Sequence, residues 1–204
     1  MNAELADLGV ATVYEAAGRH GLVDLDLVQL VPGSRAGGPA RTVRCGQADN
    51  LMVHAAMERT QPGDVLVLTM PQPEPVALVG ELLVTQARER GAAALLVDAA
   101  VRDVEDLRSI GLPVWARWVR VRGATKAEVG AIDAPVEVGG ARIRPGDTVV
   151  LDSDGVVVVA QERAGEVLEA ARERAERERV KRSKLEAGAL SYDLDGLRRV
   201  VEEM

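Results

Sequence analysis

The segment VLVLTMPQPEPVALVGELLVTQARERGAAALLVD, residues 65–98, sets the class of this fold. Its ends are two apolar runs, VLVLTM at 65–70 and AALLVD at 93–98, which predict buried strands. Between them, GELLVTQARER predicts a helix that begins around Gly80 and ends at Gly91, since glycine is the common residue just beyond a helix. A strand–helix–strand unit predicts parallel pairing, because parallel strands need a long crossover connection.

The alternation continues downstream of this unit. DVEDLRSI at 103–110 predicts a short helix, and LPVWAR at 112–117 predicts another strand. The segment 135–160 then holds four short strand-like stretches separated by turns, of which Gly139-Gly140 fits a two-residue hairpin. We expect these strands to join the same core, which makes the protein an α/β fold.

The upstream part predicts three elements. Residues 2–20 predict one helix, because their apolar side chains recur near one face. A short strand, a Gly/Pro-rich turn and a second strand near 41–45 follow. Asp49 is placed to cap the next helix. The loop PQPEP at 71–75 is expected to be rigid, because proline blocks both helix and strand ladder.

The C-terminal part changes to a charged helical pattern from Gln161 to Lys184, and a short last helix is expected at 193–203. A charge-rich helix with one narrow apolar stripe is typical of a surface or of a contact with a neighbouring subunit. We therefore expect one domain at 1–160 and a helical tail at 161–204. The stripe consists of Val167, Leu168, Ala171 and Ala175.

Composition excludes several classes of protein. The chain has 204 residues, 47% of them hydrophobic, and a net charge of −7, which argues against a nucleic-acid binder. Cys45 is the only cysteine, so a disulfide within the chain and a cysteine zinc site are excluded. No membrane-spanning stretch or signal-like N-terminus is present in the sequence. We expect a soluble cytoplasmic protein that has no nucleic-acid or membrane partner.

The first candidate site is GELL, residues 80–83. The first backbone N–H groups of a helix lack partners inside the helix and carry partial positive charge. The N–H groups of Leu82 and Leu83 are therefore suited to hold an anionic oxygen, and Gly80 permits close approach. Many helices begin with Gly-Glu and bind nothing, so this motif alone is a weak signal.

The second candidate is the pair Arg102–Asp103, at the end of the strand that contains Asp98. A guanidinium binds a carboxylate with two hydrogen bonds, and a carboxylate is a suitable ligand for Mg²⁺ or Mn²⁺. Together they suit a 2-oxo acid, whose carbonyl must be polarised. The alternative is structural: Arg102 pairs with Asp98 or Glu105, and Asp103 only caps the helix. The local sequence slightly favours this alternative.

Other chemistries have little support. His20 and His54 are the only histidines, so a site of several histidines is excluded, and a core or surface role is expected for His54. A Schiff-base lysine needs desolvation. Lys181 and Lys184 lie in the charged tail, while Lys126 remains an option in a polar loop. No GxSxG, GxGxxG or P-loop motif is present.

Twenty residues separate Glu81 from Arg102, and this spacing resembles the (D/E)-x20-RD pattern of the RraA-like proteins. The chain is most similar to the 4-hydroxy-4-methyl-2-oxoglutarate / 4-carboxy-4-hydroxy-2-oxoadipate aldolases. The similarity covers nearly the whole length. It includes VATVYEAAGRHGL, DNLMVHAAMERTQPGD, IGLPVWARWVRVRGATKAEVGAIDAPVEVGG, RPGDTVVLDSDGVVVV and KRSKLEAG.

The resemblance implies a layered α/β/β swivelling-domain fold and a class II, metal-dependent aldolase. Such an enzyme cleaves a 4-hydroxy-2-oxo diacid to pyruvate and a second oxo acid, and commonly also decarboxylates oxaloacetate. Arg102 would bind the pyruvoyl carboxylate, with Gly80, Glu81 and the N–H groups of Leu82 and Leu83 also at the substrate.

The resemblance further implies that Asp103 ligates Mg²⁺ or Mn²⁺, with waters completing the coordination. Family members form trimers or hexamers whose sites lie between subunits, and a tail glutamate from the neighbouring subunit organises the metal's waters. Glu178 is the best match, with Glu173 and Glu176 as alternatives. A metal-bound water, oriented by Glu81, is the expected general base, so the expected catalytic residues are Arg102, Asp103 and Glu81.

Two departures and two rival functions accompany the resemblance. Ala99 stands where many relatives have glycine, and the loop TMPQPEPVAL at 69–78 differs from the aldolase pattern, which leaves the second oxo acid open.

The main rival is a regulator of ribonuclease E, because such RraA proteins share the fold but lack the metal-binding aspartate. Asp103 favours the enzyme. A methyltransferase is not supported, because no glycine-rich nucleotide loop is present.

Overall fold

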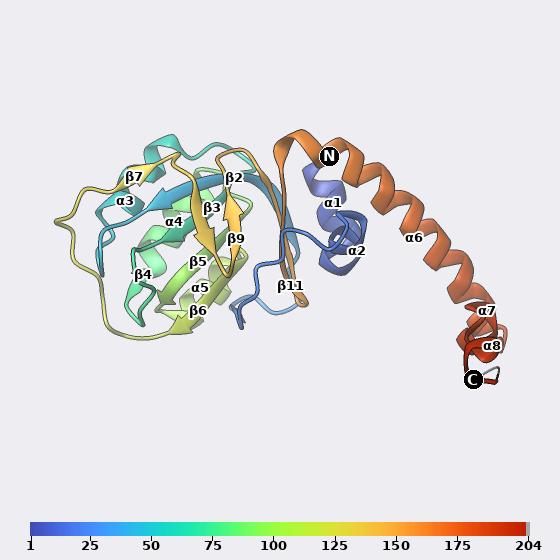
Figure 1. Ribbon diagram of the computed structural model, residues 1–204. Helices are drawn as coiled ribbons and strands as arrows, with labels where there is room; N and C mark the ends of the chain where they lie inside the picture. Colours follow the sequence, from blue (N-terminus) through green and yellow to red (C-terminus); the bar gives the residue numbers. More distant parts are fainter. Residues whose placement is uncertain (203–204) are drawn as a thin grey trace.

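The computed structural model describes residues 1–202, and these form a nine-stranded mixed sheet, a separate hairpin and helices on both sides (Figure 1). The sheet order is β1-β6-β5-β3-β2-β10-β11, with β4 paired to β5 and β7 paired to β2; β8 and β9 form the hairpin. The strands are β1 (Val28–Gln29), β2 (Ala36–Arg44), β3 (Val65–Thr69), β4 (Ala77–Val79), β5 (Ala94–Val101), β6 (Val114–Val119), β7 (Ala131–Ile132), β8 (Val136–Val138), β9 (Ala141–Ile143), β10 (Thr148–Asp152) and β11 (Gly155–Val159). The helices are α1 (Asn2–Leu8), α2 (Val10–Ala16), α3 (Leu51–Arg59), α4 (Glu81–Glu89), α5 (Val104–Ile110), the 3-10 turn η1 (Gln161–Arg163), α6 (Ala164–Glu186), α7 (Ser191–Leu194) and α8 (Leu197–Glu202).

The centre of the sheet is parallel, as predicted from the strand–helix–strand unit. β3 pairs in parallel with both β2 and β5, and β5 pairs in parallel with β6. Every residue of β3 and β5 is buried, which is expected of parallel strands covered on both faces. The strand predicted at 93–98 is longer than expected and continues to Val101. This extension carries the chain directly to Arg102.

Three apolar cores lie between neighbouring layers and hold them together. The first joins α3, α4 and α5 to one face of the parallel strands, with Met57 as a member. The second joins the opposite face to the β8–β9 hairpin and to β10 and β11, with Leu96 as a member. The third packs α1, α2 and the start of α6 on the outer face of β10 and β11, with Leu5 as a member. The predicted layered α/β/β fold with a C-terminal helix is confirmed.

The single helix predicted over residues 2–20 is wrong. The chain forms two short helices that meet at Gly9, whose φ is 86°, a value that glycine adopts without steric strain. The N–H of Val10 donates to Oδ2 of Asp152 at 2.8 Å. The break therefore lets both short helices pack on β10 and β11, which a straight helix would not.

The strand near 41–45 is also longer than predicted, because β2 includes Gly37, Gly38 and Pro39 of the expected turn. A Cβ built on Gly38 would lie 2.0 Å from the carbonyl oxygen of Gly63, so close approach of two backbones explains this glycine. The three-residue strand β4 was not predicted, and it lies directly after the Pro-rich loop.

The four β-strands predicted after residue 135 are confirmed as β8 to β11. Gly139 and Gly140 connect β8 to β9 with φ values of 52° and 76°, which fits a two-residue hairpin turn. The expectation that this segment joins the same core is correct: β10 pairs with β2, and the β8–β9 hairpin, whose strands pair only with each other, packs in the second core.

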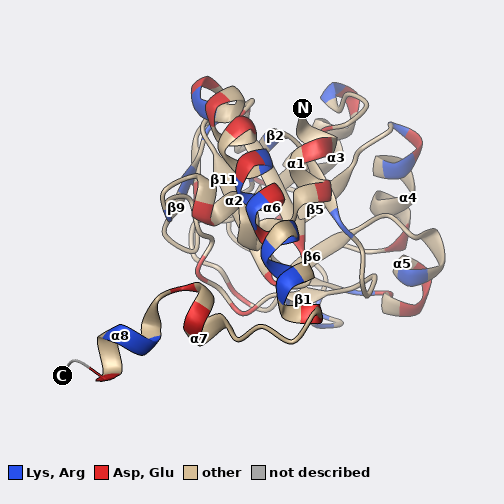
Figure 2. Cartoon of the chain, turned by 90° about the vertical axis from the view of Figure 1, so that its right-hand side faces the viewer, with Lys and Arg blue, Asp and Glu red and all other residues tan. Residues whose placement is uncertain are grey.

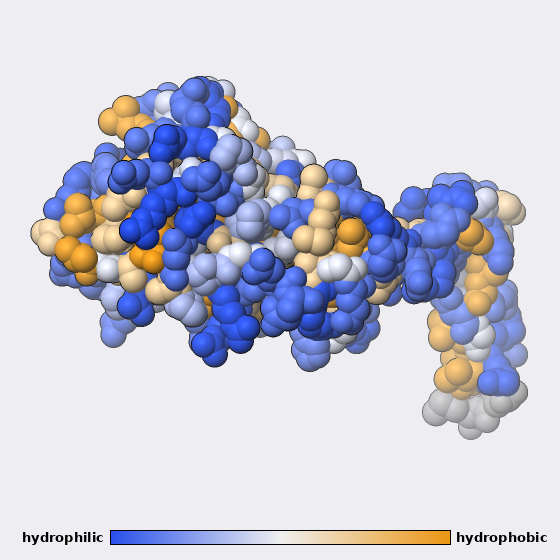
Figure 3. Space-filling view, turned by 90° about the horizontal axis from the view of Figure 1, so that it is seen from above, coloured by the Kyte–Doolittle hydropathy of each residue, from blue (hydrophilic) through white to orange (hydrophobic). Residues whose placement is uncertain are grey.

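The tail begins on the core and then leaves it. The first turns of α6 bury Ala164, Val167, Leu168 and Ala171, and the helix then extends away from the body, with α7 and α8 at its far end (Figure 1). Acidic and basic side chains alternate along α6 (Figure 2). Apolar side chains gather at the far end (Figure 3), where Leu190, Leu194, Leu197, Val200 and Val201 are exposed.

Contact of the tail with a neighbouring subunit stays a prediction. The single last helix predicted at 193–203 is wrong, because the chain forms α7 and α8 with a break at Gly196, whose φ is 67°. Residue 203 lies outside the described residues. Within residues 1–202, no helix has the length and apolar character that a membrane crossing requires.

Candidate functional site

The candidate site forms where two neighbouring parallel strands end. Gly80 and Glu81 follow β4, while Arg102 and Asp103 follow β5. The two strands pair through Val79 and Val101, and the N–H of Arg102 donates to the carbonyl oxygen of Val79 at 3.2 Å. Parallel strands present their carboxyl ends at one edge of a sheet, where ligands of α/β proteins commonly bind. The two predicted motifs therefore meet because of strand pairing.

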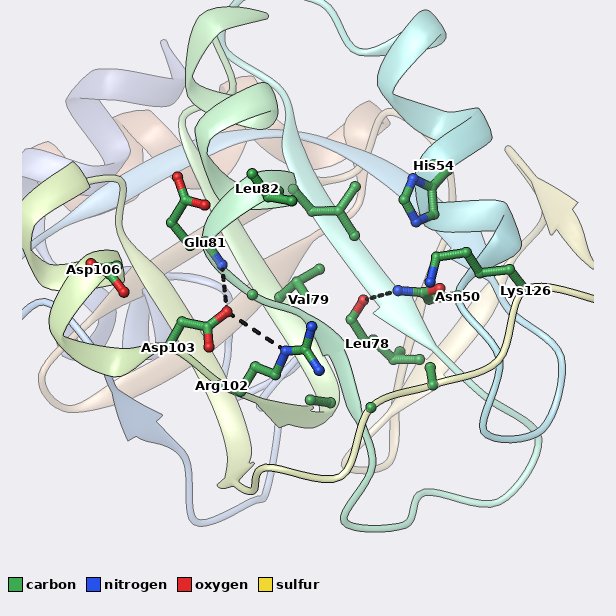
Figure 4. A pocket seen from close by; sticks show the side chains of 15 residues that line it. Asn50, His54, Leu78, Val79, Glu81, Leu82, Arg102, Asp103, Asp106 and Lys126 are labelled. Carbon is green, nitrogen blue, oxygen red and sulfur yellow. Dashed lines mark hydrogen bonds and ion pairs between the residues drawn. The ribbon is translucent and has the colours of Figure 1, made fainter.

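Asp103 has an unusual backbone and an unexpected partner. Its φ is 60° and its ψ is 45°, a left-handed conformation that aspartate tolerates better than most residues. Its side chain does not cap α5, which begins at the next residue. Its Oδ2 atom instead accepts the N–H of Glu81 at 3.0 Å (Figure 4). Asp103 thus caps α4 rather than its own helix.

The structural alternative considered for Arg102 is wrong. Asp98 forms its ion pair with Arg117, and Glu105 lies 4.0 Å from Arg108. The Nε atom of Arg102 lies 3.6 Å from Oδ2 of Asp103, and the two side chains are 49% and 39% exposed. Arg102 is therefore loosely held and accessible to a ligand.

The start of α4 supplies backbone donors to the same place. The N–H of Glu81 is taken by Asp103, while those of Leu82 and Leu83 have no acceptor within the helix because of their position in its first turn. The side chain of Leu82 is exposed and that of Leu83 is buried. The Glu81 carboxylate accepts the Thr85 hydroxyl at 3.1 Å, which fixes its orientation.

A pocket of about 560 Å³ contains all six predicted site residues. Its opposite wall comes from α3 and from the loop after β6 (Figure 4). The predicted residues that line it are Gly80, Glu81, Leu82, Leu83, Arg102 and Asp103. The further polar or glycine residues that line it are Asn50, His54, Asp106, Gly123 and Lys126.

Asn50 is the most unusual residue of the opposite wall. It is 7% exposed, and its Nδ2 atom donates to the carbonyl oxygen of Leu78 at 2.8 Å. Its Oδ1 atom is buried and has no hydrogen-bond partner among the described residues. A buried acceptor without a partner is destabilising, and such groups are rare in folded proteins.

The loop that carries Lys126 is fixed by Asp49. The Asp49 carboxylate accepts the hydroxyl of Thr125 at 2.7 Å, the N–H of Ala127 at 2.6 Å and the N–H of Leu51 at 2.8 Å. Burial opposes ionisation of Asp49, but these hydrogen bonds outweigh it and lower its pKa to about 2. Asp49 therefore holds the start of α3, as predicted, and also orders one wall of the pocket.

His54 lies on α3 at the same wall (Figure 4). Burial lowers its pKa, and the positive charge of Lys126 lowers it further. The structure thus places at a pocket a histidine that the sequence assigned to the core or the surface. Lys126 is exposed, which does not favour a Schiff-base role, since that role needs desolvation.

Sequence reasoning did not assign Asn50, His54 or Lys126 to the site. One signal was available for Asn50. It lies shortly after β2, a strand of the same parallel set, so its loop was expected at the same edge as GELL and Arg102. The loop of Lys126 lacks such a signal, because a hydrogen bond to Asp49, far away in sequence, determines its position.

The pocket offers few side-chain ligands for a divalent cation. Residues 1–202 contain no group of three or more histidine, cysteine or acidic side chains that could hold a metal. Asp103 can supply one carboxylate ligand to a metal ion, because its contacts with Glu81 and Arg102 both involve Oδ2 and not Oδ1. Mg²⁺ is usually bound by one or two carboxylates and keeps several waters, so Asp103 fits such an ion.

The tail glutamates do not reach this pocket within one chain. Glu178 pairs with Arg174 at 2.9 Å, and Glu176 pairs with Arg179 at 2.7 Å, all on α6. Glu173 likewise lies 3.7 Å from Arg177. Any contact with the pocket would therefore have to come from a second copy, as predicted, and that contact stays a prediction.

Comparison with known proteins gives one matching family. The RraA-like model, described as Aldolase/RraA, matches residues 4–158. A protein of Halalkalibacterium halodurans, provisionally named a 4-hydroxy-4-methyl-2-oxoglutarate aldolase, is 36% identical over 137 residues, which are 67% of this chain and 65% of that relative. The match thus spans slightly less than two thirds of the relative's length.

Two solved structures are also similar. Streptomyces coelicolor RraAS2, described as an unusual member of the RNase ES inhibitor RraA family, is 31% identical with a TM-score of 0.78, covering 88% of this chain and 94% of that one. A Geobacillus kaustophilus protein described as an S-adenosylmethionine: 2-dimethylmenaquinone methyltransferase is 33% identical with a TM-score of 0.65, covering 69% and 86%.

Proposed function

The chain belongs to the RraA-like family, and we propose that it is a divalent-metal-dependent aldolase, which cleaves a 4-hydroxy-2-oxo diacid such as 4-hydroxy-4-methyl-2-oxoglutarate to pyruvate and a second oxo acid. One observation carries this proposal. Arg102, Asp103 and the free N–H groups of α4 converge on one pocket from two neighbouring strand ends. A guanidinium, a carboxylate and helix N–H groups suit a 2-oxo acid and a cation together.

Each residue has a separate role in the proposed reaction. Arg102 binds the carboxylate next to the 2-oxo group, and the N–H groups of Leu82 and Leu83 hold substrate oxygens. Mg²⁺ or Mn²⁺ at Asp103 would supply a Lewis acid toward the 2-oxo group when bound. Glu81 orients a water that removes the proton of the 4-hydroxyl. The bond between carbons 3 and 4 then breaks, and its electron pair leaves with pyruvate as the enolate.

The charge balance of the pocket supports a bound cation. Three carboxylates line it, from Glu81, Asp103 and Asp106, against the two full positive charges of Arg102 and Lys126. A dianionic substrate would meet a net negative pocket unless a cation compensates the carboxylates. The same site would decarboxylate oxaloacetate, because loss of carbon dioxide leaves the same pyruvate enolate.

The opposite wall would hold the far end of the substrate. Lys126 provides a positive charge for the second carboxylate, and Asn50, fixed by its hydrogen bond to the carbonyl oxygen of Leu78, lines the space beside it. In this arrangement the two carboxylates of the substrate lie at opposite walls, with Arg102 at one and Lys126 at the other.

We also propose that the enzyme is a trimer or a hexamer. The apolar side chains at the far end of the tail and the distance of Glu178 from the pocket of its own chain support contact with a second copy. Glu178 of that copy, or Glu173 or Glu176, would then order waters around the cation. Measurement of the molar mass in solution tests this point.

Pyruvate release tests the proposed activity. The purified protein is incubated with oxaloacetate and, separately, with 4-hydroxy-4-methyl-2-oxoglutarate, with Mg²⁺, with Mn²⁺ and with a chelator. We expect release of pyruvate that depends on the metal. The absence of release from both substrates, with either metal, contradicts the proposal.

A second candidate is a regulator of ribonuclease E. The similarity to Streptomyces coelicolor RraAS2 over 88% of the chain supports it. Asp103 distinguishes the two functions, because RraA-type regulators are expected to lack this aspartate. Inhibition of ribonuclease E cleavage by the Asp103→Asn variant, together with an absence of pyruvate release from the unmodified protein, would favour the regulator.

A further inference from the structure

Two glycines lie against the Arg102–Asp103 pair from different sides. A Cβ built on Gly80 would lie 2.3 Å from Oδ2 of Asp103 and 3.2 Å from Nε of Arg102. A Cβ built on Gly123 would lie 2.8 Å from Nη1 of Arg102. Real Cβ atoms do not approach other heavy atoms to 2.8 Å or less, so any side chain at either position must displace the pair.

Neither glycine is explained by its backbone conformation. Gly80 has a φ of −143°, and the φ of Gly123 also lies outside the left-handed region, so alanine would be free of backbone strain at both positions. The space that a side chain would fill is therefore the remaining reason for glycine. At both positions that space holds a functional group of the proposed site.

The backbone at Gly123 is held in place. Gly123 forms a parallel bridge with Ala77 of β4, and the N–H of Ala77 donates to the carbonyl oxygen of Arg122 at 2.7 Å. An added methyl group at Gly123 would consequently move the guanidinium and not the loop. The Arg102 guanidinium is the far end of a flexible, half-exposed side chain, so it can move without disturbing the core.

Gly80 limits the position of Asp103, the other member of the pair. Asp103 has a short side chain, and the N–H of Glu81 fixes its Oδ2 atom at 3.0 Å. A methyl group at Gly80 must push this carboxylate away from the start of α4. The two glycines thus limit different atoms, with Gly80 controlling mainly the carboxylate and Gly123 controlling the guanidinium alone.

We propose that Gly80 and Gly123 are positioning residues whose bare backbone forms a slot that directs Arg102 and Asp103 into the pocket. This inference rests on the proposed function, since it assigns the carboxylate to a metal ion and the guanidinium to a substrate carboxylate. The slot predicts that the two groups can be displaced separately. A general structural role of the glycines would instead change both affinities together in each variant.

The test compares Gly123→Ala and Gly80→Ala with Gly165→Ala. Gly165 is a suitable control, because it lies on α6, its φ is outside the left-handed region and nothing lies within 4 Å of its built Cβ. The measurements are the affinity for Mn²⁺ alone, the affinity for pyruvate at saturating Mg²⁺, and the melting temperature, all on the full chain.

We expect Gly123→Ala to weaken pyruvate binding by about tenfold or more and to leave Mn²⁺ affinity unchanged, because only the charged hydrogen bonds of Arg102 are lost. Gly80→Ala should weaken Mn²⁺ binding by a similar factor, and Gly165→Ala should change neither. Gly123→Ala should melt at the temperature of the unmodified protein, and Gly165→Ala should melt no lower, because alanine suits a helix better than glycine. Gly80→Ala should melt lower, because it removes the hydrogen bond by which Asp103 caps α4. Pyruvate binding by Gly123→Ala at the original affinity would overturn the inference.

A crystal structure of ligand-free Gly123→Ala separates this inference from the proposed function. If the unmodified protein binds neither Mn²⁺ nor pyruvate, the proposed function is wrong, and the position of Arg102 in the variant still decides about the slot. A displaced guanidinium over an unchanged loop supports the inference. An unchanged guanidinium with a shifted loop contradicts it.

Discussion

Two pairs of arginine and aspartate belong to the same part of the sheet, one inside strands β5 and β6 and one just beyond β5, and they differ in exposure and in how closely they pair. Asp98 in β5 pairs with Arg117 in β6, with side chains only 5% and 24% exposed, and Arg117 also stacks over Trp118 at 5.4 Å. Arg102 and Asp103, just beyond β5, are 49% and 39% exposed and 3.6 Å apart. The same two residue types therefore form a closed pair inside the protein and an open pair at the pocket.

The difference identifies which pair can bind a ligand. Burial raises the pKa of Asp98, while the charge of Arg117 and their contact lower it in part. Each group of that pair compensates the other, so neither has capacity for a substrate. Arg102 and Asp103 remain solvated and face a pocket, where an anion and a cation can replace water. Exposure and incomplete pairing, rather than residue type, distinguish the pair that we propose to bind ligands from the buried one.

Arg102→Ala should have the largest effect on activity. Loss of a bidentate, charged contact to the substrate carboxylate should reduce the kcat/KM of pyruvate release by about 10³-fold, with an unchanged melting temperature. Arg88→Ala is the matched control, because Arg88 is a half-exposed arginine that pairs with Glu89 outside the pocket. Equal activity in the two variants would refute the role of Arg102.

Asp98→Asn should lower the stability of the protein and leave ligand binding unchanged. Removing one partner leaves the Arg117 charge largely buried without compensation, so the free energy of unfolding should fall by about 3 kcal/mol. Urea denaturation measures this change. Below the unfolding transition, affinity for Mn²⁺ should stay as it is in the unmodified protein. A stable Asp98→Asn variant would show that the two pairs do not differ as we describe.

Lys126→Ala tests the opposite wall of the pocket. We expect the KM for the diacid to rise about tenfold, as one partly exposed ionic contact to the second carboxylate is lost. A 4-hydroxy-2-oxo monoacid should show no such change, and this comparison serves as the control. An equal loss for both substrates would mean that Lys126 does not contact the second carboxylate.

Asp49→Asn should lower the stability less than Asp98→Asn does, and this effect should depend on pH. The pKa of Asp49 is lowered from 3.8 to about 2, so its ionised form stabilises the fold above pH 4, and that stabilisation is lost as pH falls toward 2. The variant should be less stable by about 2 kcal/mol at pH 7, because a pKa lowered by nearly two units corresponds to a difference of this size. Urea titrations at several pH values should show the difference disappearing below pH 4. A difference that is constant with pH would contradict this assignment.

Much of the fold follows from the sequence, and the exceptions share a cause. The buried runs that became β3 and β5 and the glycine-bounded helix α4 have strong local signals. The break at Gly9 and the glycines inside β2 depend on contacts with Asp152 and Gly63, which are distant in sequence. No local pattern contains those contacts, so local reasoning failed there.

The site divides in the same way. GELL and Arg102–Asp103 were only weak candidates from their local sequence, and the resemblance of their spacing to the (D/E)-x20-RD pattern singled them out. The capping of α4 by Asp103 could not be predicted, since it depends on the pairing of β4 with β5. Asn50 and Lys126 also escaped prediction, because long-range hydrogen bonds bring their loops to the pocket.

The affinity for Mn²⁺, measured by titration for the unmodified protein, Asp103→Asn and Asp98→Asn, tests the central comparison most directly. Asparagine keeps an oxygen that can accept the Glu81 N–H, so Asp103→Asn should fold normally. We predict that Asp103→Asn loses Mn²⁺ binding at unchanged stability, while Asp98→Asn keeps Mn²⁺ binding at lower stability. Binding of Mn²⁺ by Asp103→Asn with the affinity of the unmodified protein would contradict the account.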